Sequence, residues 1–535
     1  MDMNGRSTSS TVAQTGRSRW IGRVRRFHRG RAACVVLVFA VLIVGAAWVV
    51  SSPVAGSPDD DYHLGSIWCP RPVASSGCQT RVVDGVTEVM VPEAVGRPVC
   101  YAFVFDRSAA CRLSLSDDRS SYSRRYDDGN YPTGYYRFHH LLVGHDVERS
   151  VLIMRGVNVL IAVALLGAIA YFMPVRLREG VAMALLASWI PMGIYFVASN
   201  NPSSWAITGV FAYALGLYAS VRSEGGRQWV LLGLGLLGAV LAFASRADSS
   251  FYVFVVSLAV LAGVRWRRGL IPHAVVAAAA SVVGIINMSG LGQTSALGGA
   301  PDEGIPWRTR LYRNLMEIPG YFAGFYGQGR GRGMGWLDIP LDGPAAVLAV
   351  GLAGAAVFAG ARAMSWRRAA SMTIMLGAMA GIPVVIGMTG SFRVWEYQSR
   401  YVLPLLAVTF LVWLVIDDRR TLLSRGQTVL FVLLSTTVHA IALHTLIQRY
   451  VSAIGADPGD RIFSLNARVT WWWSIPISPM GVWLVGVLAY LGAVSTTMCL
   501  ARRRTDGPGN AIRNPVVPPK AHRETDSTIG VAVSN

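Results

Sequence analysis

Three consecutive carboxylates, Asp59, Asp60 and Asp61, closely follow an apolar segment at residues 33–50. A carboxylate can take the proton from an attacking hydroxyl group and so act as a general base. An acidic turn beside an apolar segment is more often simply solvated, so these residues alone do not establish a reaction centre. The residue types elsewhere in the chain must decide between the two interpretations.

Arginine side chains occur in other short connections between apolar segments. Arg246 lies in "SRADSS", and Arg393 and Arg400 lie in "FRVWEYQSRY". Arginine binds phosphate oxygens through paired N–H groups and stabilises charge on a leaving group. We therefore take Arg400 as the first candidate for a phosphate ligand, with Arg246 and Arg393 as weaker candidates. The alternatives are an arginine that snorkels from a helix end, or a local ion pair with Asp248 or Glu396.

The composition excludes a soluble globular protein. Of the 535 residues, 53% are hydrophobic and only 15% are charged. Apolar segments of about 17 to 25 residues recur, and each is long enough to cross a hydrocarbon core of about 30 Å as a helix. The sequence predicts an all-α polytopic membrane protein with about 12 transmembrane helices (11–13), at residues 33–52, 151–174, 180–198, 203–221, 228–245, 250–264, 270–288, 344–361, 370–388, 402–416, 427–446 and 481–500.

The distribution of charge predicts the orientation of these helices. The formal net charge is +19, eight arginines lie within the first 31 residues, and every second connection is rich in arginine. Basic connections stay on the cytoplasmic side, so we expect both termini in the cytoplasm. Because the arginines mark helix ends, the positive charge does not indicate a nucleic-acid partner. Residues 1–32 and 501–535 are expected to be disordered cytoplasmic tails of a transmembrane domain at 33–500.

The connections on the opposite side of the membrane are much longer. They are a loop at 53–149, a second large loop at 289–343, the segment 388–401 and a loop at 447–480. Within the second loop, residues 310–327 have the pattern of a helix that lies along the membrane interface. All the acidic and basic candidates named above fall on this outer side, and this concentration favours a functional interpretation.

Four of the six cysteines, Cys69, Cys78, Cys100 and Cys111, lie in the loop at 53–149. Clustering of this kind in an exported loop favours disulfides. The local pairs Cys69–Cys78 and Cys100–Cys111 are the simplest of the three connectivities. Free thiols or a zinc site of irregular spacing are the alternatives.

Acids and arginines at the outer membrane surface suit the transfer of a sugar from a lipid-linked phosphate donor, because nucleotide-sugars are not supplied there. The partners would be a polyprenyl-phosphate-linked sugar, an envelope glycan, lipid or protein acceptor, and the bilayer. One alternative is a transporter or flippase for a lipid-linked glycan or envelope polymer, and another is a non-enzymatic envelope assembly protein. Large outer loops and span centres nearly free of charge favour the enzyme over the transporter.

Five segments together resemble one known family: "GSPDDDYHLGSIWC", "YPTGYYRF", "LIMRGVNVLIA", "NPSSWAITG" and "QSRYVLP". In this order they are similar to the bacterial multi-pass membrane family catalogued as domain-of-unknown-function 2142, over roughly residues 35–500. That family resembles the GT-C superfamily of integral-membrane glycosyltransferases, which use polyprenyl-phosphate sugars. The resemblance implies a GT-C-like fold in the bacterial cytoplasmic (inner) membrane.

In the GT-C enzymes the base is an acidic residue just after the first span, so the resemblance implies Asp59, or next Asp60, as the base. The family commonly has Pro-Asp-Glu where this sequence has Pro58-Asp59-Asp60, which leaves the division of work between the two acids open. No cofactor is assigned, and a divalent cation stays open. The residues expected to bind or support the substrate are Asp61, His63, Tyr135, Arg155, Asn201, Asp248, Glu396, Gln398 and Tyr401.

Overall fold

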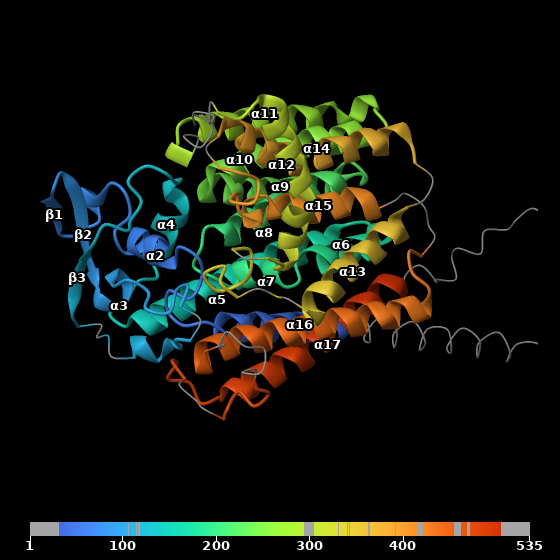
Figure 1. Cartoon of the computed structure of the whole chain (residues 1–535). Helices are drawn as coiled ribbons and strands as arrows, with labels where there is room; N and C mark the ends of the chain where they lie inside the picture. Colours follow the sequence, from blue (N-terminus) through green and yellow to red (C-terminus); the bar gives the residue numbers. More distant parts are fainter. Residues whose placement is uncertain are drawn as a thin grey trace, which may run out of the picture.

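The structure is a computed structural model in which helices dominate. It describes residues 32–503 except 105, 114, 116–117, 294–303, 330, 340, 342, 362–363, 391, 416–420, 454–461 and 468–470. Figure 1 shows a bundle of helices with a small three-stranded sheet at one end. Nearly all of both predicted tails lies outside the described residues.

Within the described residues, seven helices are long and apolar enough to cross a membrane. They are Ala32–Val49, α5 (Val147–Phe172), α9 (Gly226–Ser245), α11 (Ile271–Ser289), α14 (Trp366–Thr389), α16 (Arg425–Ser452) and α17 (Pro479–Arg503). Three shorter apolar helices are α10 (Ala247–Gly263), α13 (Pro344–Gly360) and α15 (Leu403–Leu414). Each of these ten helices coincides with a predicted span, so the multi-pass membrane architecture is confirmed.

The other two predicted spans differ from a simple crossing helix. Residues 180–198 form two helices, α6 (Arg178–Ser188) and α7 (Met192–Val197), separated at Pro191. Proline lacks the backbone N–H that a continuous helix needs, so these residues do not form one continuous helix, and a membrane crossing at this position stays a prediction. Residues 203–221 form α8 (Ser203–Ser220), which is buried along its whole length. The total of twelve spans therefore stays a prediction.

Close contact with α9 explains why α8 is buried. A Cβ on Gly216 would lie 2.5 Å from the Cα of Gly235, and a Cβ on Gly209 would lie 2.6 Å from the carbonyl oxygen of Gly238. Glycines at facing positions allow two helix backbones to approach closely, as is common between membrane helices. The α8–α9 pair thus forms a rigid wall beside the loops that carry the candidate site.

Hydrogen bonds join connections that are expected to share one side of the membrane. On the side expected to be cytoplasmic, Arg502 donates to the carbonyl of Leu423. On the side expected to be external, Asn201 donates to the carbonyl of Pro58 at 2.9 Å. Further contacts join Arg176 to Arg222 at the first end and Ser474 to Glu148 at the second.

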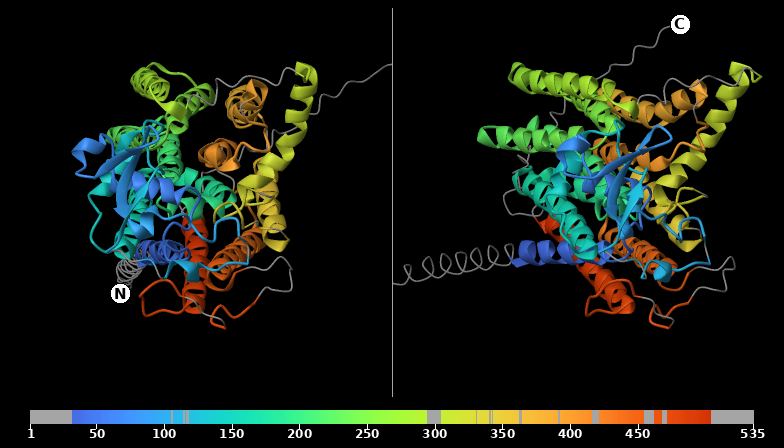
Figure 2. Two further views of the ribbon diagram at one scale, coloured as in Figure 1. Left: turned by 60° about the vertical axis from the view of Figure 1, so that its left-hand side comes forward. Right: turned by 90° about the vertical axis from the view of Figure 1, so that its left-hand side faces the viewer.

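The first large loop folds into a small unit that covers one end of the bundle (Figures 1 and 2). It contains an antiparallel sheet of β1 (Thr80–Val83), β2 (Val86–Pro92) and β3 (Ser120–Ser123) in the order β1-β2-β3. Three helices accompany the sheet, namely α2 (Asp60–Trp68), α3 (Glu93–Gly96) and α4 (Thr133–His140). The strict all-α prediction is thus wrong for this loop, because its short alternating strands carry much weaker signals than the apolar spans.

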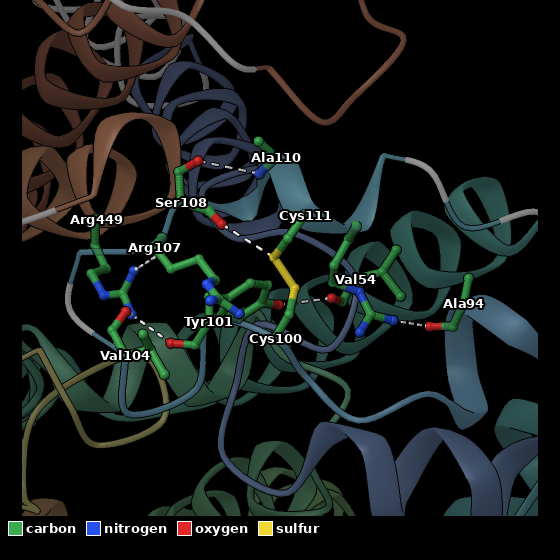
Figure 3. Close-up of a disulfide and its surroundings, with 11 residues drawn as sticks. Val54, Ala94, Cys100, Tyr101, Val104, Arg107, Ser108, Ala110, Cys111 and Arg449 are labelled. Atoms are coloured by element: carbon green, nitrogen blue, oxygen red, sulfur yellow. Dashed lines mark hydrogen bonds between the residues drawn. A yellow bond between two sulfur atoms is a disulfide. The ribbon is translucent and has the colours of Figure 1, made fainter.

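Both predicted disulfides are present in this unit. Cys69 is bonded to Cys78, and Cys100 is bonded to Cys111. Figure 3 shows the second disulfide beside the buried guanidinium of Arg449 in α16. This guanidinium donates to the backbone carbonyls of Tyr101, Val104 and Arg107 and pairs with Asp338 at 3.3 Å. Arg449 therefore fastens the disulfide-bonded segment to the bundle and to the second large loop.

The helix expected at 310–327 is α12 (Trp307–Ala323), followed by the short turn Gly324–Tyr326. Pro319 lies inside this helix. Leu315 is exposed, which fits an element that meets the lipid interface. The side chain of Glu317 accepts a hydrogen bond from the backbone N–H of Trp395 at 2.8 Å, so α12 also supports the segment that leads to Arg400.

We predict that the sheet-bearing loop lies outside the cell. Val82, in β1, has an exposed fraction of 69%, so Val82→Cys should react with a membrane-impermeant maleimide added to intact cells. Arg265→Cys, at an exposed position in a connection expected to be cytoplasmic, should react only after the cells are lysed. The free cysteines Cys34 and Cys499 are first replaced by alanine. The reverse labelling pattern would contradict the orientation.

Candidate functional site

In the turn after the first helix, the side chains of Asp59 and Asp60 point in different directions. Asp59 precedes α2 and has a left-handed backbone (φ 58°, ψ 16°), and its carbonyl accepts the N–H of His63 at 2.9 Å. A left-handed backbone is uncommon outside glycine but is tolerated by Asp and Asn. At this turn Asp60 enters the protein interior, whereas Asp59 stays partly exposed.

Asp60 is fully buried, and its carboxylate has hydrogen-bond and ion-pair partners within the protein. It accepts hydrogen bonds from the backbone N–H and the hydroxyl of Ser57, and it pairs with Arg155 at 3.4 Å. Burial raises the pKa of Asp60 more than Arg155 and Ser57 lower it. Asp60 is not among the described residues that line the cavity beside Asp59, which suits a structural carboxylate.

Arg155, in α5, fixes the end of the first helix. Its guanidinium donates to the carbonyls of Val49 (3.2 Å), Ser52 (2.7 Å) and Pro53 (2.9 Å). Carbonyls at the C-terminal end of a helix have no partner within the helix, so Arg155 supplies the missing donors. The amide of Asn201 holds the next part of the turn through its hydrogen bond to the Pro58 carbonyl. These contacts determine where Asp59 projects.

Asp59 lies between two arginines. Its Oδ2 accepts from Arg400 Nη2 at 2.6 Å, and its Oδ1 accepts from Arg125 Nη2 at 3.4 Å. Burial by itself raises the pKa of Asp59, but the charge and hydrogen bond of Arg400, with smaller effects of His63 and Arg125, lower it to about 2. In this arrangement Asp59 is ionised and only weakly basic.

Arg400 lies in the short turn Ser399–Tyr401, just before α15. Its Nε donates to the side chain of Gln398, and its Nη2 reaches the hydroxyl of Tyr401 at 3.4 Å as well as Asp59. The side chain is only 3% exposed. Its Nη1 is buried and has no hydrogen-bond partner within the described part of the chain. Arg400 thus keeps one donor group available for a further acceptor.

Arg246 begins α10 and forms a fork with Asp248. Its Nε lies 2.9 Å from Oδ1, and its Nη2 lies 2.7 Å from Oδ2. The guanidinium also lies over the rings of Tyr401 at 4.8 Å and Tyr131 at 5.6 Å, which adds cation–π attraction. The predicted local ion pair is therefore present, and it lies next to the aromatic residues that surround Arg400.

Arg125 is a site residue that the sequence-based selection missed. It lies between β3 and α4 and forms a fork with Asp61, with Nε 2.9 Å from Oδ2 and Nη2 3.0 Å from Oδ1. Tyr131 was missed as well, although it belongs to the segment "YPTGYYRF". No motif marks Arg125, because only the folding of the loop brings it to residues 59–61.

A cavity of about 1150 Å³ lies beside Asp59. Asp59, Arg125, Tyr131, Arg246 and Asp248 line its charged end. Three more residues expected at the site, Glu396, Gln398 and Tyr401, also line it.

The other end of the cavity is apolar and lies between α10 and α14. Phe251 and Val255 line one side, and Gly377, Gly381 and Val385 line the other. A Cβ added to either glycine would meet no neighbouring atom within 4 Å, so this part of the helix surface is open space. Gly377 and Val385 are exposed, and the cavity is therefore accessible from the surroundings of α14.

His63 packs against Tyr131, a residue that lines the charged end of the cavity. Its Nδ1 lies 2.9 Å from the hydroxyl of Tyr136, and its ring packs edge-on against Tyr131 with centroids 5.3 Å apart. Nε2 is buried without a partner among the residues that the structure describes. Burial lowers the pKa of His63 to about 3, against the attraction of Asp59. His63 is therefore neutral at physiological pH.

Two other expected site residues lie apart from the cavity lining. Tyr135 is fully buried, where its hydroxyl accepts from Asn158 at 3.2 Å and its ring packs against Trp205. Arg393 is exposed, and its backbone N–H donates to the carboxylate of Glu396 at 2.9 Å. The structure thus brings Arg246, but neither Arg393 nor Arg400, to the cavity lining. Arg400 lies directly behind the lining, in contact with the lining residues Asp59 and Gln398.

A metal ion has no ready-made site in the described part of the chain. No group of three or more histidine, cysteine, aspartate or glutamate side chains is arranged there to hold one. The carboxylates at the charged end are instead paired with arginines.

The model of the family described as "Predicted membrane protein (DUF2142)" matches residues 42–409, more than half of the chain. The chain belongs to this family. Among curated proteins and solved structures, nothing matches it. The match to the DUF2142 model starts within the first helix and ends within α15, so Asp59 and Arg400 both lie inside it. α16 and α17 lie beyond the match, which is shorter than the span of 35–500 expected from the sequence.

The family description gives this DUF2142 protein a membrane location and no activity. The likeness to GT-C enzymes remains an expectation from the sequence. The geometry of the charged cavity must therefore carry the functional argument.

Proposed function

We propose that this DUF2142 protein is an integral-membrane glycosyltransferase. It moves a sugar from a polyprenyl-phosphate donor to a hydroxyl group of an envelope glycan, lipid or protein on the extracytoplasmic side of a bacterial inner membrane. The observation that carries the proposal is the cavity itself. One end joins a carboxylate to guanidinium groups, and the other is an open apolar groove between two helices. A phosphate attached to a long hydrocarbon chain combines the same two chemistries in one ligand.

The charged end suits the phosphate of such a donor. Arg246 lines the cavity with its guanidinium. Arg400 lies directly behind the lining residues Asp59 and Gln398, and its buried Nη1 has no partner within the described part of the chain. Guanidinium groups bind phosphate oxygens through charge-assisted hydrogen bonds. They also stabilise the negative charge that grows on a phosphate as it leaves.

The apolar end suits the polyprenyl chain. Its lining runs along α10 from Asp248 to Val255, which is about 10 Å of helix at about 1.5 Å per residue. Along α14 it runs from Gly377 to Ile386. The glycines leave room for a chain that enters from the lipid, where its transfer into the groove costs little because both environments are apolar.

The reaction needs a base next to the acceptor, and Asp59 is the carboxylate that borders the cavity from the first loop. The acceptor hydroxyl oxygen attacks the anomeric carbon of the donor sugar. The bond from that carbon to the phosphate oxygen breaks, and its electron pair stays on the phosphate. The hydroxyl proton passes to Asp59, so the products are the glycosylated acceptor, polyprenyl phosphate and a protonated Asp59, which releases its proton to water.

The two neighbouring acids should behave differently when each is changed to the amide. Asp59→Asn should lower sugar transfer by about 10²- to 10⁴-fold, because a positioned general base contributes about this much. Asn tolerates the left-handed backbone, and Asp59 is partly exposed, so losing its charge beside Arg400 should lower the stability less than losing that of the buried Asp60. Asp60→Asn leaves the buried Arg155 without its counter-charge, which typically costs about 3–5 kcal/mol of stability.

The measurement is transfer from a polyprenyl-phosphate sugar by purified protein in nanodiscs, together with its thermal unfolding midpoint. Asp60→Asn should lower the unfolding midpoint more than Asp59→Asn does, whereas Asp59→Asn should lower the transfer in a protein that remains folded. Transfer near the wild-type rate by a stable Asp59→Asn variant would overturn the catalytic role of this residue.

The apolar groove gives a second prediction. The Cβ of Gly381→Leu would meet no neighbouring atom within 4 Å, and the rest of the side chain would occupy the groove. The substitution should therefore raise the KM for a long-chain donor by about tenfold, which corresponds to about 1.4 kcal/mol of binding. A donor with a very short chain should be affected much less.

The matched control is Gly354→Leu in α13, where a Cβ also meets no atom within 4 Å and which lies outside the cavity lining. It places the same side chain in a membrane helix without narrowing the groove. An equal rise in KM for long and short donors, or for both variants, would count against the groove as the chain-binding site.

A further inference from the structure

We propose that the ion pair between Asp59 and Arg400 is a resting-state contact that the donor phosphate breaks, so that the donor itself releases the base. This inference rests on the proposed function, because it assigns a regulatory role to the same cavity. Before the donor binds, Asp59 is held by the group that should bind the phosphate. After it binds, Arg400 holds the phosphate and Asp59 is free to accept a proton.

The first observation is that the guanidinium groups at the charged end, and that of Arg400 directly behind it, each already hold a carboxylate. Arg400 holds Asp59, Arg125 holds Asp61, and Arg246 holds Asp248. An entering phosphate must therefore compete with a carboxylate for at least one arginine, unless it uses only the unpaired Nη1 of Arg400.

The second observation is that the Asp59–Arg400 pair is the easiest of the three to exchange. Arg125–Asp61 and Arg246–Asp248 are forks in which two guanidinium nitrogens reach two carboxylate oxygens. Arg400 instead donates to a single oxygen of Asp59 through Nη2, and its Nη1 remains unused. A phosphate could accept from Nη1 and Nη2 at the same time. Two such hydrogen bonds bind the guanidinium more strongly than the single bond that Asp59 makes with it.

The third observation concerns the burial and the contacts of Arg400 and Asp59. Arg400 is 3% exposed and is held in place by Gln398, whereas Asp59 has an exposed fraction of 39%. Asp59 can therefore move toward the open cavity while Arg400 stays fixed. Its second contact, with Arg125 at 3.4 Å, comes from a half-exposed side chain that can move with it.

The exchange explains how Asp59 can act as a base although its ion pair with Arg400 makes it weakly basic. With Arg400 paired to it, Asp59 has a pKa of about 2, which makes it a poor acceptor for a hydroxyl proton. Once the phosphate takes over Arg400, the main cause of the lowered pKa is removed and the negative phosphate lies close by, and both changes raise the basicity of Asp59. Only an anionic donor can cause this change, so a neutral sugar lipid would leave the base inactive.

Competition of this kind has a thermodynamic consequence that does not depend on turnover. If the phosphate must displace the Asp59 carboxylate, removal of that carboxylate strengthens phosphate binding, because coupling between two ligands of one group is reciprocal. We test this with farnesyl phosphate as the probe, measured by isothermal titration calorimetry on the full chain in nanodiscs. Asp59→Asn should bind it at least about fivefold more tightly than the wild type, the lower limit of typical coupling.

Three further variants complete the experiment. Asp59→Gly removes the carboxylate at a position whose left-handed backbone suits glycine, and it should bind the probe as tightly as Asp59→Asn. Arg400→Gln should bind it more weakly than the wild type. Asp128→Asn removes an exposed carboxylate from the same loop. Asp128 is not a lining residue, and Asn in its place keeps an oxygen that can accept from the lining residue Asn130, so this variant should bind as the wild type does.

The outcomes separate this inference from the proposed function. Tighter binding by both Asp59 variants, with weaker binding by Arg400→Gln, supports the exchange. Equal or weaker binding by the Asp59 variants, with weaker binding by Arg400→Gln, overturns the exchange and leaves the donor site in place. Absence of farnesyl phosphate binding by the wild type, or binding that Arg400→Gln does not change, overturns both.

Discussion

The guanidinium of Arg155 lies wholly inside the protein, where an uncompensated charge would cost several kcal/mol. It is compensated by the carbonyls at the end of the first helix and by the carboxylate of Asp60. The same contacts join α5, the first helix and the beginning of α2. Because Asp60 is used in this way, the left-handed residue before it projects elsewhere, and Asp59 borders the cavity. The position of the candidate base thus depends on a buried charge that takes no part in the proposed reaction.

At the charged end of the cavity, as around Arg155, carboxylates compensate the charge of arginines. Arginines beside hydrocarbon are costly unless they are paired, and here Asp59, Asp61 and Asp248 pair with three of them. These ion pairs offset the cost of placing arginines beside hydrocarbon. They also occupy the guanidinium groups that an anionic substrate would need. Exchange of one carboxylate for a phosphate keeps the number of ion pairs constant. It therefore lets a polyprenyl phosphate enter without leaving an arginine unpaired next to the membrane.

The sequence predicted those features that depend on local pattern, and it missed those that depend on folding at a distance. Ten apolar spans and both disulfides follow from composition and spacing. The break at Pro191 was not foreseen, because a proline in an apolar run does not always end the helix, and Pro319 and Pro383 lie inside α12 and α14. The three-stranded sheet was not foreseen because short strands in a loop are weak signals. Asp59 and Arg400 were selected from their residue types, and the fold joins them across 341 positions of sequence. Arg125 has no such signal, since only the turn after β3 brings it to the acids.

A cryo-electron microscopy map of the protein in nanodiscs with bound farnesyl phosphate tests the central claim most directly. The account predicts density for the phosphate within hydrogen-bonding distance of Arg400, density for the farnesyl chain between α10 and α14, and an Asp59 carboxylate that has left Arg400. Phosphate density outside this cavity, with the Asp59–Arg400 contact intact, would contradict it.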